Sequence, residues 1–247
     1  MPGMASAVAE RIFLRGHVEA VEQAASRTWR IRLTAPAMAR TATLPGQQVR
    51  VLVSGPVDGL STLLLGTSRT YSLWSHQDDQ VELCVYDHGE GPGNEWVRGL
   101  RPGDEVAFRP PEGRFVLDPA APYHLFVGEE TATVPIGAML RALAARSDAQ
   151  ADAVLEAEDA SARLDLAGHS RLRVHWVDRG SGRAPDPDRL LGALREVALP
   201  ETPGTAYVAG EARTCQAVRG YLMREHGWPR RNIRVKPFWA PGKRGME

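Results

Sequence analysis

Apolar and polar positions in the first half of the chain alternate in short runs, the pattern of half-buried strands. The clearest run, Gln47–Ser54, places valines at positions 49, 51 and 53. Connections rich in glycine and proline separate the runs, and Gly93–Arg98 is typical of one short helix. Such a series of short strands indicates a closed antiparallel barrel. The predicted strands are Phe13–Gln23, Thr28–Thr34, Gln47–Ser54, Arg69–Trp74, Gln80–Tyr86 and Glu105–Arg109, with a polar turn at His76–Asp79.

The pattern changes at Asp118–Pro122, a segment with two prolines and no periodicity that we interpret as a linker. Beyond it strand patterns alternate with helical ones, which predicts a doubly wound parallel α/β sheet with helices on both faces. We therefore predict a β-barrel domain over residues 1–120 and an α/β domain over residues 121–247. The α/β strands are expected at Tyr123–Val127, Asp152–Ala157, Leu172–Val177, Thr205–Ala209 and Ile233–Phe238, and the helices at Pro135–Ala145, Asp188–Val197 and Glu211–Glu225.

Composition narrows the class of protein. The 247 residues are 43% hydrophobic and 24% charged, as in ordinary globular domains, and 30 basic residues balance 30 acidic ones. Zero net charge argues against a general nucleic-acid binder. No apolar run approaches the roughly 18 residues of a membrane span, and no secretory signal is visible, so we expect a cytoplasmic protein without stable membrane association. The two cysteines, Cys84 and Cys215, are too few for an iron–sulfur cluster, and we interpret both as small buried side chains.

Two segments of the predicted barrel carry candidate chemistry. Arg69-Thr70-Tyr71-Ser72 lies on a strand, where an arginine fork suits a pyrophosphate and a nearby tyrosine offers a flat ring. The plainer interpretation is an exposed arginine beside a half-buried tyrosine. The segment Asp87–Trp96 contains three glycines and leads from a strand into a helix, so that its backbone could approach an anion. A glycine-rich turn with Trp96 in the core is the alternative.

Two further segments end predicted strands of the α/β domain. Gly128-Glu129-Glu130-Thr131 joins the first strand to its helix, and Gly210-Glu211 follows the strand TAYVA. Both lie at the carboxyl edge, where doubly wound sheets bind dinucleotides. The glycine pattern G-x-G-x-x-G is absent, and two acids at a phosphate site would repel the phosphate. We therefore expect the acids to face ribose hydroxyls or a flavin ring.

Taken in order, these segments resemble the siderophore-interacting proteins, a family of flavin-dependent ferric-siderophore reductases within the ferredoxin-reductase-like superfamily. Arg69–Ser72 is similar to the family's R-x-Y-[ST] motif, and His88–Trp96 to its H-G-x-G-P-A-x-x-W segment. Gly128–Pro135 resembles G-D-E-T-A-x-P, with Glu129 in place of the aspartate. Ala209-Gly210-Glu211 and the closing run from Phe238 resemble A-G-E and Y-W-x-x-G. Two residues depart from the family's pattern. Gly93 replaces an alanine, which still permits close approach of the backbone, and Phe238 replaces a tyrosine, which loses one hydroxyl group.

The resemblance implies a Greek-key barrel that binds FAD and an α/β domain that binds NADH or NADPH, with a C-terminal tail that returns to the flavin. In this family-based assignment Arg69 holds the pyrophosphate, Tyr71 and Ser72 contact the flavin ring, and Trp239 lies near it. The implied FAD residues are Arg69, Thr70, Tyr71, Ser72, Leu73, Asp87, His88, Gly89, Gly91, Pro92, Gly93, Asn94, Trp96, Thr131 and Trp239. The implied residues on the dinucleotide side are Gly128, Glu129, Glu130, Thr131, Gly210 and Glu211.

The implied reaction needs no general acid or base and no resident metal, because a flavin accepts two electrons from a nicotinamide and can pass them on singly to Fe(III). Fe(II) is held less tightly than Fe(III) by the hard oxygens of a siderophore, so reduction releases iron. The only two lysines, Lys236 and Lys243, flank the Phe238-Trp239 signature together with Arg244. We expect these three to attract anionic ferric siderophores, with a solvated basic tail as the alternative.

Alternatives stay open for both the electron donor and the electron acceptor. Acids after the second α/β strand favour NADH, because a carboxylate accepts the ribose hydroxyl and repels a 2′-phosphate; Arg163 could reverse this preference. Ferredoxin is an alternative donor. The alternative functions are a reductase that exchanges electrons with ferredoxin or flavodoxin, and a siderophore- or flavin-binding protein without turnover. The acids concerned are Glu156, Glu158 and Asp159.

Overall fold

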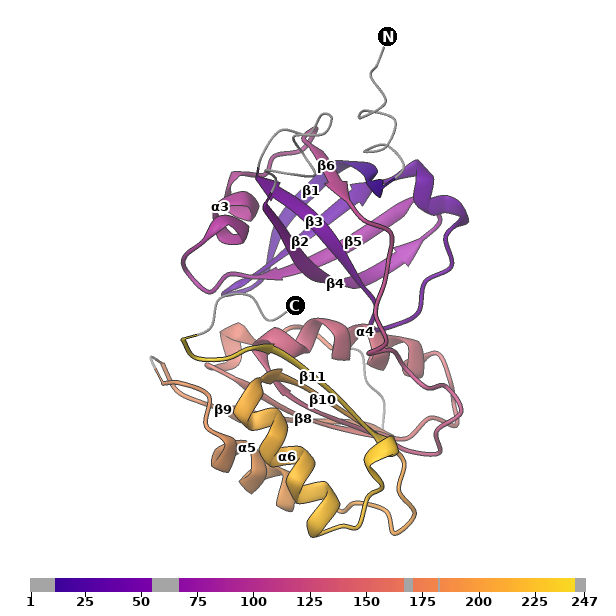
Figure 1. The fold of residues 1–247 in the computed structure, drawn as a ribbon, viewed down its shortest axis with the longest axis vertical. Coiled ribbons are helices and arrows are strands. Elements are labelled where there is room, and N and C mark those ends of the chain that lie inside the picture. The colour runs from indigo at the N-terminus through magenta and orange to yellow at the C-terminus, as the bar shows by residue number, and fades with distance from the viewer. Residues whose placement is uncertain (1–11, 55–66, 167–170, 182, 243–247) are drawn as a thin grey trace. The chain divides into compact units, whose positions relative to one another are not determined.

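The computed structural model describes residues 12–54, 67–166, 171–181 and 183–242. The chain forms two compact units, one ending at Arg114 and the other beginning at Phe115 (Figure 1). The division falls slightly before the expected end of the barrel domain at residue 120. Phe115 and Leu117 belong to the hydrophobic core of the second unit, so the chain joins that unit before the predicted linker.

Six antiparallel strands close the first unit into a barrel in the order β1-β2-β5-β4-β3-β6. The strand β6 returns to lie beside β3, which is the connection of a Greek key. The alternating valines of β3 are buried, and with the inward residues of the other strands they form one core. Helix α3 accompanies the barrel. The elements are β1 (Leu14–Ala25), β2 (Thr28–Thr34), η1 (Pro36–Arg40), β3 (Gln48–Ser54), β4 (Thr67–Gln77), β5 (Gln80–Tyr86), α3 (Pro92–Gly99) and β6 (Glu105–Phe108).

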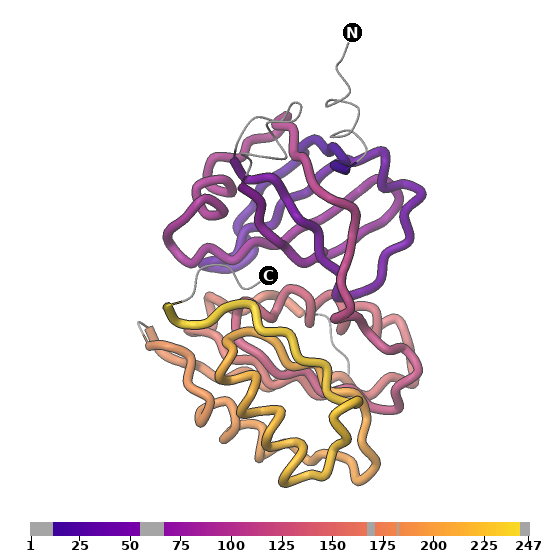
Figure 2. Tube along the Cα trace, viewed as in Figure 1, coloured from indigo at the N-terminus to yellow at the C-terminus, as the bar shows by residue number. Residues whose placement is uncertain are grey.

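The second unit is a five-stranded parallel sheet in the order β11-β10-β7-β8-β9. Figure 2 follows the chain through this sheet, with α4 on one face and α5 and α6 on the other. The strand order reverses between β7 and β10, so their carboxyl ends form a topological switch point. The elements are β7 (His124–Glu129), η2 (Glu130–Ala132), α4 (Thr133–Ala144), β8 (Ala151–Ala157), η3 (Ala160–Ala162), β9 (Leu172–Asp178), α5 (Pro187–Arg195), β10 (Thr205–Glu211), α6 (Ala212–Arg224), η4 (Arg230–Asn232) and β11 (Ile233–Trp239).

The predicted architecture is confirmed, and the remaining differences lie at element ends. The expected turn at His76–Asp79 shrinks to two residues, because β4 runs to Gln77 and Asp78 alone takes a positive φ of 55°. Helix α4 begins at Thr133 instead of Pro135, since a proline is tolerated anywhere in a first turn.

Each unit contains one cysteine, and both thiols are reduced and buried as expected: Cys84 lies on β5 and Cys215 on α6. Within the described ranges, no helix has the length and apolar character needed to cross a bilayer.

Candidate functional site

Strand β4 presents Arg69 and Tyr71 on one face, as strand alternation predicts. The phenol ring of Tyr71 stacks on the indole of Trp96 from α3, with ring centroids 5.6 Å apart and planes 15° apart. The Tyr71 hydroxyl fills the space that a side chain at Gly93 would take, so the glycine lets the ring reach α3. Burial raises the pKa of the Tyr71 hydroxyl, which therefore stays protonated. The structure thus brings two separate segments of the predicted flavin site together, one on β4 and one on α3, and Arg69 is exposed beside them.

The first half of β4, which carries Arg69–Ser72, pairs with β3 on one side but not with β5 on the other. The strand pairs with β3 over Thr67–Ser72, but its pairing with β5 covers Leu73–Gln77. Thr70 and Ser72 alternate with Arg69 and Tyr71 and are half-buried. Leu73 lies in the barrel core, so its side chain is committed to packing there.

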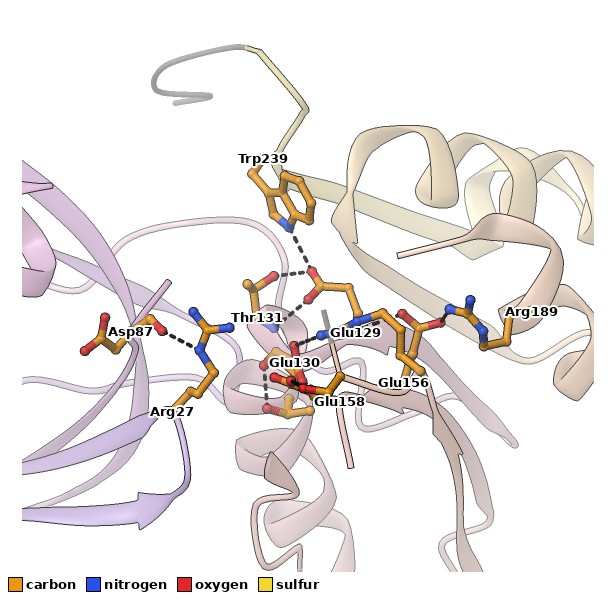
Figure 3. A network of polar contacts seen from close by, with 12 residues as sticks. Arg27, Asp87, Glu129, Glu130, Thr131, Glu156, Glu158, Arg189 and Trp239 are labelled. Atoms are coloured by element: carbon orange, nitrogen blue, oxygen red, sulfur yellow. Dashed lines mark hydrogen bonds and ion pairs between the residues drawn. The ribbon is translucent and has the colours of Figure 1, made fainter. Parts of the chain in front are cut away.

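The glycine-rich loop between β5 and α3 is held in shape by charged side chains. Arg98 donates to both carboxylate oxygens of Asp87 at 2.7 Å and to the carbonyl of Gly89 at 3.0 Å. The Gly89 amide donates to the same carboxylate at 2.9 Å, and Arg27 donates to the Asp87 carbonyl at 3.0 Å (Figure 3). These pairings lower the pKa of Asp87 against the opposing effect of burial, which is the largest single influence. Asp87 therefore organises the loop through Arg98, a residue that the sequence analysis did not single out.

The backbone of this loop leaves room for a ligand. Gly89 and Gly91 have φ values of +108° and +101°, and, apart from the adjoining residues, no heavy atom of the described chain lies within 4 Å of where a Cβ would stand. Pro92 occupies the first turn of α3. Asn94 is buried and donates from its side chain to the Glu90 carbonyl, and it also contacts the exposed ring of His88 at 3.3 Å. A fixed loop with open glycines, an exposed arginine and an aromatic pair fits the pyrophosphate and ring of FAD.

In the second unit, the residues from Gly128 to Thr131 form the end of β7 and the turn into α4. A side chain at Gly128 would collide with Ala132 and with the Ala209 carbonyl, so glycine permits the close approach of β7, η2 and β10. The carboxylate of Glu129 is buried. It accepts hydrogen bonds from the Thr131 amide at 3.0 Å, from the Thr131 hydroxyl, and from the Trp239 indole at 3.0 Å (Figure 3). Burial raises the pKa of Glu129, and these three donors oppose the rise.

The neighbouring acid, Glu130, belongs to a buried charge network. Arg179, which follows β9, donates to Glu130 at 2.9 Å and to Glu156 at 3.3 Å. Arg189 on α5 donates to the second oxygen of Glu156 at 2.8 Å. Glu130, Glu156 and the Arg179 side chain are each at most 6% exposed, so the ion pairs have little competition from water. We call these four residues the Arg179 network.

The Arg179 network changes the interpretation of the acids after β8. Glu156 is buried and occupied by two arginines, so its carboxylate does not face a ribose. Glu158 is half-buried and accepts from the Ser181 hydroxyl at 2.7 Å. Asp159 is occupied locally, because it accepts from the amide and hydroxyl of Ser161. Arg163 is paired with Asp178 and stacks on Trp176. Of these three acids, Glu156 alone is fully buried, and Glu158 and Asp159 lie nearer the surface.

At the end of β10, Glu211 caps helix α6. One carboxylate oxygen accepts from the amide and hydroxyl of Thr214 at 2.8 and 3.1 Å. The other oxygen, Oε1, is buried and has no hydrogen-bond partner among the described residues. A buried acceptor without a partner costs free energy that a ligand donor would recover. Burial, together with Glu129 and Glu211, raises the pKa of Cys215 to about 12, so this nearby thiol is not ionised.

The C-terminal signature is only partly described. Lys236 lies on β11 with its ammonium 5.4 Å from the ring centroid of Phe238, and Phe238 packs against the α4 side of the sheet. Lys243 and Arg244 lie outside the described residues. The predicted grouping of the three cations around the signature therefore stays a prediction.

This chain is similar to proteins whose names refer to siderophores. The model of the family "Siderophore-interacting protein" matches residues 121–242. The ferric vibriobactin reductase ViuB of Vibrio cholerae is 27% identical over 170 residues, which cover 68% of this chain and 61% of ViuB. The match thus spans less than two thirds of that relative. Two solved structures share the fold: the siderophore-interacting protein SipS of Aeromonas hydrophila (TM-score 0.81, 21% identity, 94% of this chain and 93% of SipS) and a siderophore utilization protein of T. fusca (TM-score 0.79, 24% identity, 95% of both chains).

Proposed function

Because this chain belongs to the siderophore-interacting protein family, we propose that it is a flavin-dependent ferric-siderophore reductase. In this proposal electrons pass from NADH or NADPH through FAD to a ferric siderophore, and Fe(II) is released. The observation that carries it is the convergence of Arg69, Tyr71 and Trp96 on a fixed loop with open glycines. ViuB, a relative named as a ferric reductase, supports the choice of reaction. Use of reduced nicotinamide also supports a cytoplasmic location.

The residues of the barrel would bind and orient FAD. The Arg69 guanidinium would pair with the pyrophosphate, and the backbone of Gly89 to Asn94 would approach it without side-chain obstruction. The Tyr71 ring, fixed by Trp96, would support the flavin ring. Bound FAD supplies the conversion of a two-electron donor into single electrons for Fe(III).

The second unit would bind the dinucleotide at its switch point. The free Oε1 of Glu211 is an acceptor suited to the amide group of a nicotinamide. Thr131 lies one strand away, at the turn that follows β7. These residues would orient the nicotinamide and need not exchange protons with it.

Visible absorbance of the purified full-length protein tests the proposed function. We expect a flavin spectrum that bleaches on anaerobic addition of NADH or NADPH and returns when a ferric siderophore is added, with Fe(II) collected by a ferrous trap. A flavin that neither nucleotide bleaches would indicate a binding protein without turnover. Bleached flavin that reoxidises with ferredoxin or flavodoxin, and not with ferric chelates, would indicate the electron-transfer alternative.

We expect Glu158 to favour NADH over NADPH. Its carboxylate would accept a ribose hydroxyl and repel a 2′-phosphate. The Glu158→Arg variant should shift the ratio of kcat/KM for NADPH to that for NADH upward by about tenfold, which corresponds to about 1.4 kcal/mol. Glu225→Arg, at the exposed end of α6, is the matched control. A wild-type preference for NADPH, or an unchanged ratio in Glu158→Arg, would contradict this assignment.

We expect Lys236 to attract anionic ferric siderophores. Lys236→Ala should raise KM for an anionic complex about threefold at low ionic strength, because steering by one half-buried charge is modest and is screened by salt. KM for an uncharged ferric complex should not change. Equal effects on the two complexes would show that the lysine acts through packing on Phe238 instead.

A further inference from the structure

A cavity of about 200 Å³ lies at the amino end of the parallel sheet, where β8 and β9 begin. This edge is opposite the carboxyl ends of β7 and β10, which form the switch point. Two of the lining residues are buried and form the floor of the cavity, and three are exposed and form its rim. The floor is formed by Tyr123 and Ala151, and the rim by Gln150, Arg171 and Arg173. We call this cavity the amino-edge pocket.

The backbone that carries these residues is fixed by hydrogen bonds at the ends of the strands. The Ala151 amide donates to the Arg171 carbonyl at 2.9 Å, which joins the floor to the rim. The His124 amide, at the start of β7, donates to the Gln150 carbonyl at 3.0 Å. The lining residues therefore come from segments that the sheet itself holds at a set spacing.

One of the two arginines is anchored by a buried carboxylate. Asp152, the second residue of β8, is fully buried. Arg173 donates to its two oxygens from Nε at 2.8 Å and from Nη2 at 2.7 Å. The Tyr123 hydroxyl donates at 2.8 Å, and His175 Nε2 lies 2.7 Å from the carboxylate. Burial is the largest single influence on the pKa of Asp152 and raises it, but the three partners together lower it, so the carboxylate is charged.

The anchor leaves much of Arg173 available to a ligand. A guanidinium has five N–H donors, and Asp152 takes two of them. The Arg173 side chain is 56% exposed, whereas that of Asp152 is 1% exposed. A buried carboxylate in an ion pair is weak evidence for stability, because the cost of its desolvation offsets much of the attraction. The pair does hold a surface arginine in one position, which reduces the side-chain entropy that a ligand would otherwise have to remove.

The lining of the pocket favours an anion. Two of its five residues are cations and none is an acid. Arg171 also donates to the Ser147 carbonyl at 3.4 Å, and the neighbouring carboxylate of Asp148 acts on it. Asp148 is paired with Arg146 at 3.3 Å, and its side chain is 74% exposed, so water screens its charge. The rim therefore keeps its attraction for an anionic ligand.

We propose that the amino-edge pocket binds a small organic carboxylate. Arg171 and the anchored Arg173 would pair with carboxylate oxygens, whose geometry matches the guanidinium fork. The Tyr123 ring and the Ala151 methyl group would pack against the carbon chain of the ligand. The volume is below the roughly 300–1,000 Å³ of pockets for drug-sized ligands, which limits the ligand to a small molecule. A bare phosphate would leave the apolar floor unused.

Titration of the ¹⁵N-labelled full chain with succinate, a small dicarboxylate, tests the pocket. We expect saturable shifts of the backbone amide resonances of Gln150, Ala151 and Arg173, with a Kd of about 1 mM. The resonances of Gly128 and Gly210, at the opposite edge of the same sheet, should stay in place. Shifts that grow without saturation, or that are largest at these two glycines, would overturn the proposal.

Two further probes test which chemistry the pocket recognises. Succinamide, the uncharged diamide of similar shape, should cause no saturable shift, because the arginines lose their ionic partner. Inorganic phosphate should bind about fivefold more weakly than succinate, because it cannot pack on the floor. Binding of succinamide as tight as that of succinate would refute recognition of charge. Tighter binding of phosphate would refute an organic carboxylate as the ligand, and either result overturns the proposal.

Three substitutions test the two arginines. Arg171→Gln should raise Kd for succinate about tenfold through loss of a charge-assisted hydrogen bond, and in this variant Asp152 keeps its three partners. Arg173→Lys keeps a cation beside Asp152 but loses the fork, and should raise Kd about fivefold. Arg40→Gln makes the same change of charge at an exposed position of the barrel unit and should leave Kd unchanged. If Arg171→Gln behaved like Arg40→Gln, or if Arg173→Lys bound succinate as the wild type does, the proposal would be wrong.

Succinate binding is measured without added flavin, nucleotide or iron, so it separates this inference from the proposed function. Absence of flavin bleaching or of ferrous output would refute the proposed reductase and leave the amino-edge pocket untouched. Conversely, a wild-type chain that does not bind succinate would overturn this inference alone, whatever the iron assay shows.

Discussion

Replacing both Arg69 and Tyr71 with alanine is expected to give a folded protein that purifies without flavin colour and releases no Fe(II). The variant loses the guanidinium that would pair with the FAD pyrophosphate and the ring that would support the flavin. A charge-assisted hydrogen bond contributes about 1.5–3 kcal/mol and an aromatic contact about 0.5–1.5 kcal/mol, so FAD affinity should fall by about 100-fold or more. The measurement is flavin absorbance per polypeptide, followed by a fluorescence titration with added FAD.

Two single variants sharpen this prediction. Tyr71→Phe keeps the ring that stacks on Trp96 and should retain most of the bound FAD. Arg40→Ala removes an exposed arginine of the same barrel and should have no effect on flavin content. Circular dichroism of the double variant checks that the barrel is intact. Full colour and full ferrous output in a folded Arg69→Ala/Tyr71→Ala protein would refute the flavin site on β4 and with it the proposed reductase.

Replacing Arg179 with alanine is expected to destabilise the second unit by about 3–5 kcal/mol. The substitution removes the side chain that joins Glu130 to Glu156, and each of these carboxylates is at most 4% exposed. A buried charge left without its partner carries a desolvation cost of that size. Because Arg189 still pairs with Glu156, most of the lost stability should come from the broken ion pair with Glu130. The free energy of unfolding from urea titration, followed by circular dichroism, measures the effect.

Two comparisons show whether charge is the cause. Arg179→Met combined with Glu130→Gln removes both the cation and one buried anion, and it should recover at least half of the lost stability. Arg231→Ala, at an exposed position of the same unit, should change stability by less than about 0.5 kcal/mol. If Arg179→Ala proved no more destabilising than Arg231→Ala, the Arg179 network would not contribute to the stability of the fold.

Local patterns were enough to predict most of the fold. The strands β2 and β5 end where their apolar and polar alternation ends, because both are bounded by turns. The strand–helix alternation after residue 122 could be interpreted as a parallel sheet, because such a sheet needs helical connections. The helix predicted from Glu211 begins at Ala212, since Glu211 is both the last residue of β10 and the cap of α6. A residue with two roles has no single local signature.

The contacts that shape the candidate sites could not be predicted in this way. Glu129 and Trp239 are 110 positions apart, and Glu130 and Arg179 are 49 apart. No periodicity links such residues; the strand order β11-β10-β7-β8-β9 brings them together. The sequence therefore indicated that Glu129 and Glu130 were important, but not that both are occupied by partners within their own unit. The same applies to Glu156, whose two arginines come from distant segments.

The two cysteines give the molecule a built-in reporter of local opening. Cys84 is 2% exposed inside the barrel unit, and Cys215, on the buried face of α6 in the other unit, is fully buried. A thiol reagent can reach either sulfur only when the surrounding unit opens, so the labelling rate of each cysteine measures the opening equilibrium of its own unit. Mass spectrometry of labelled peptides would then show, without any engineered probe, whether the barrel or the α/β unit opens first under denaturing conditions.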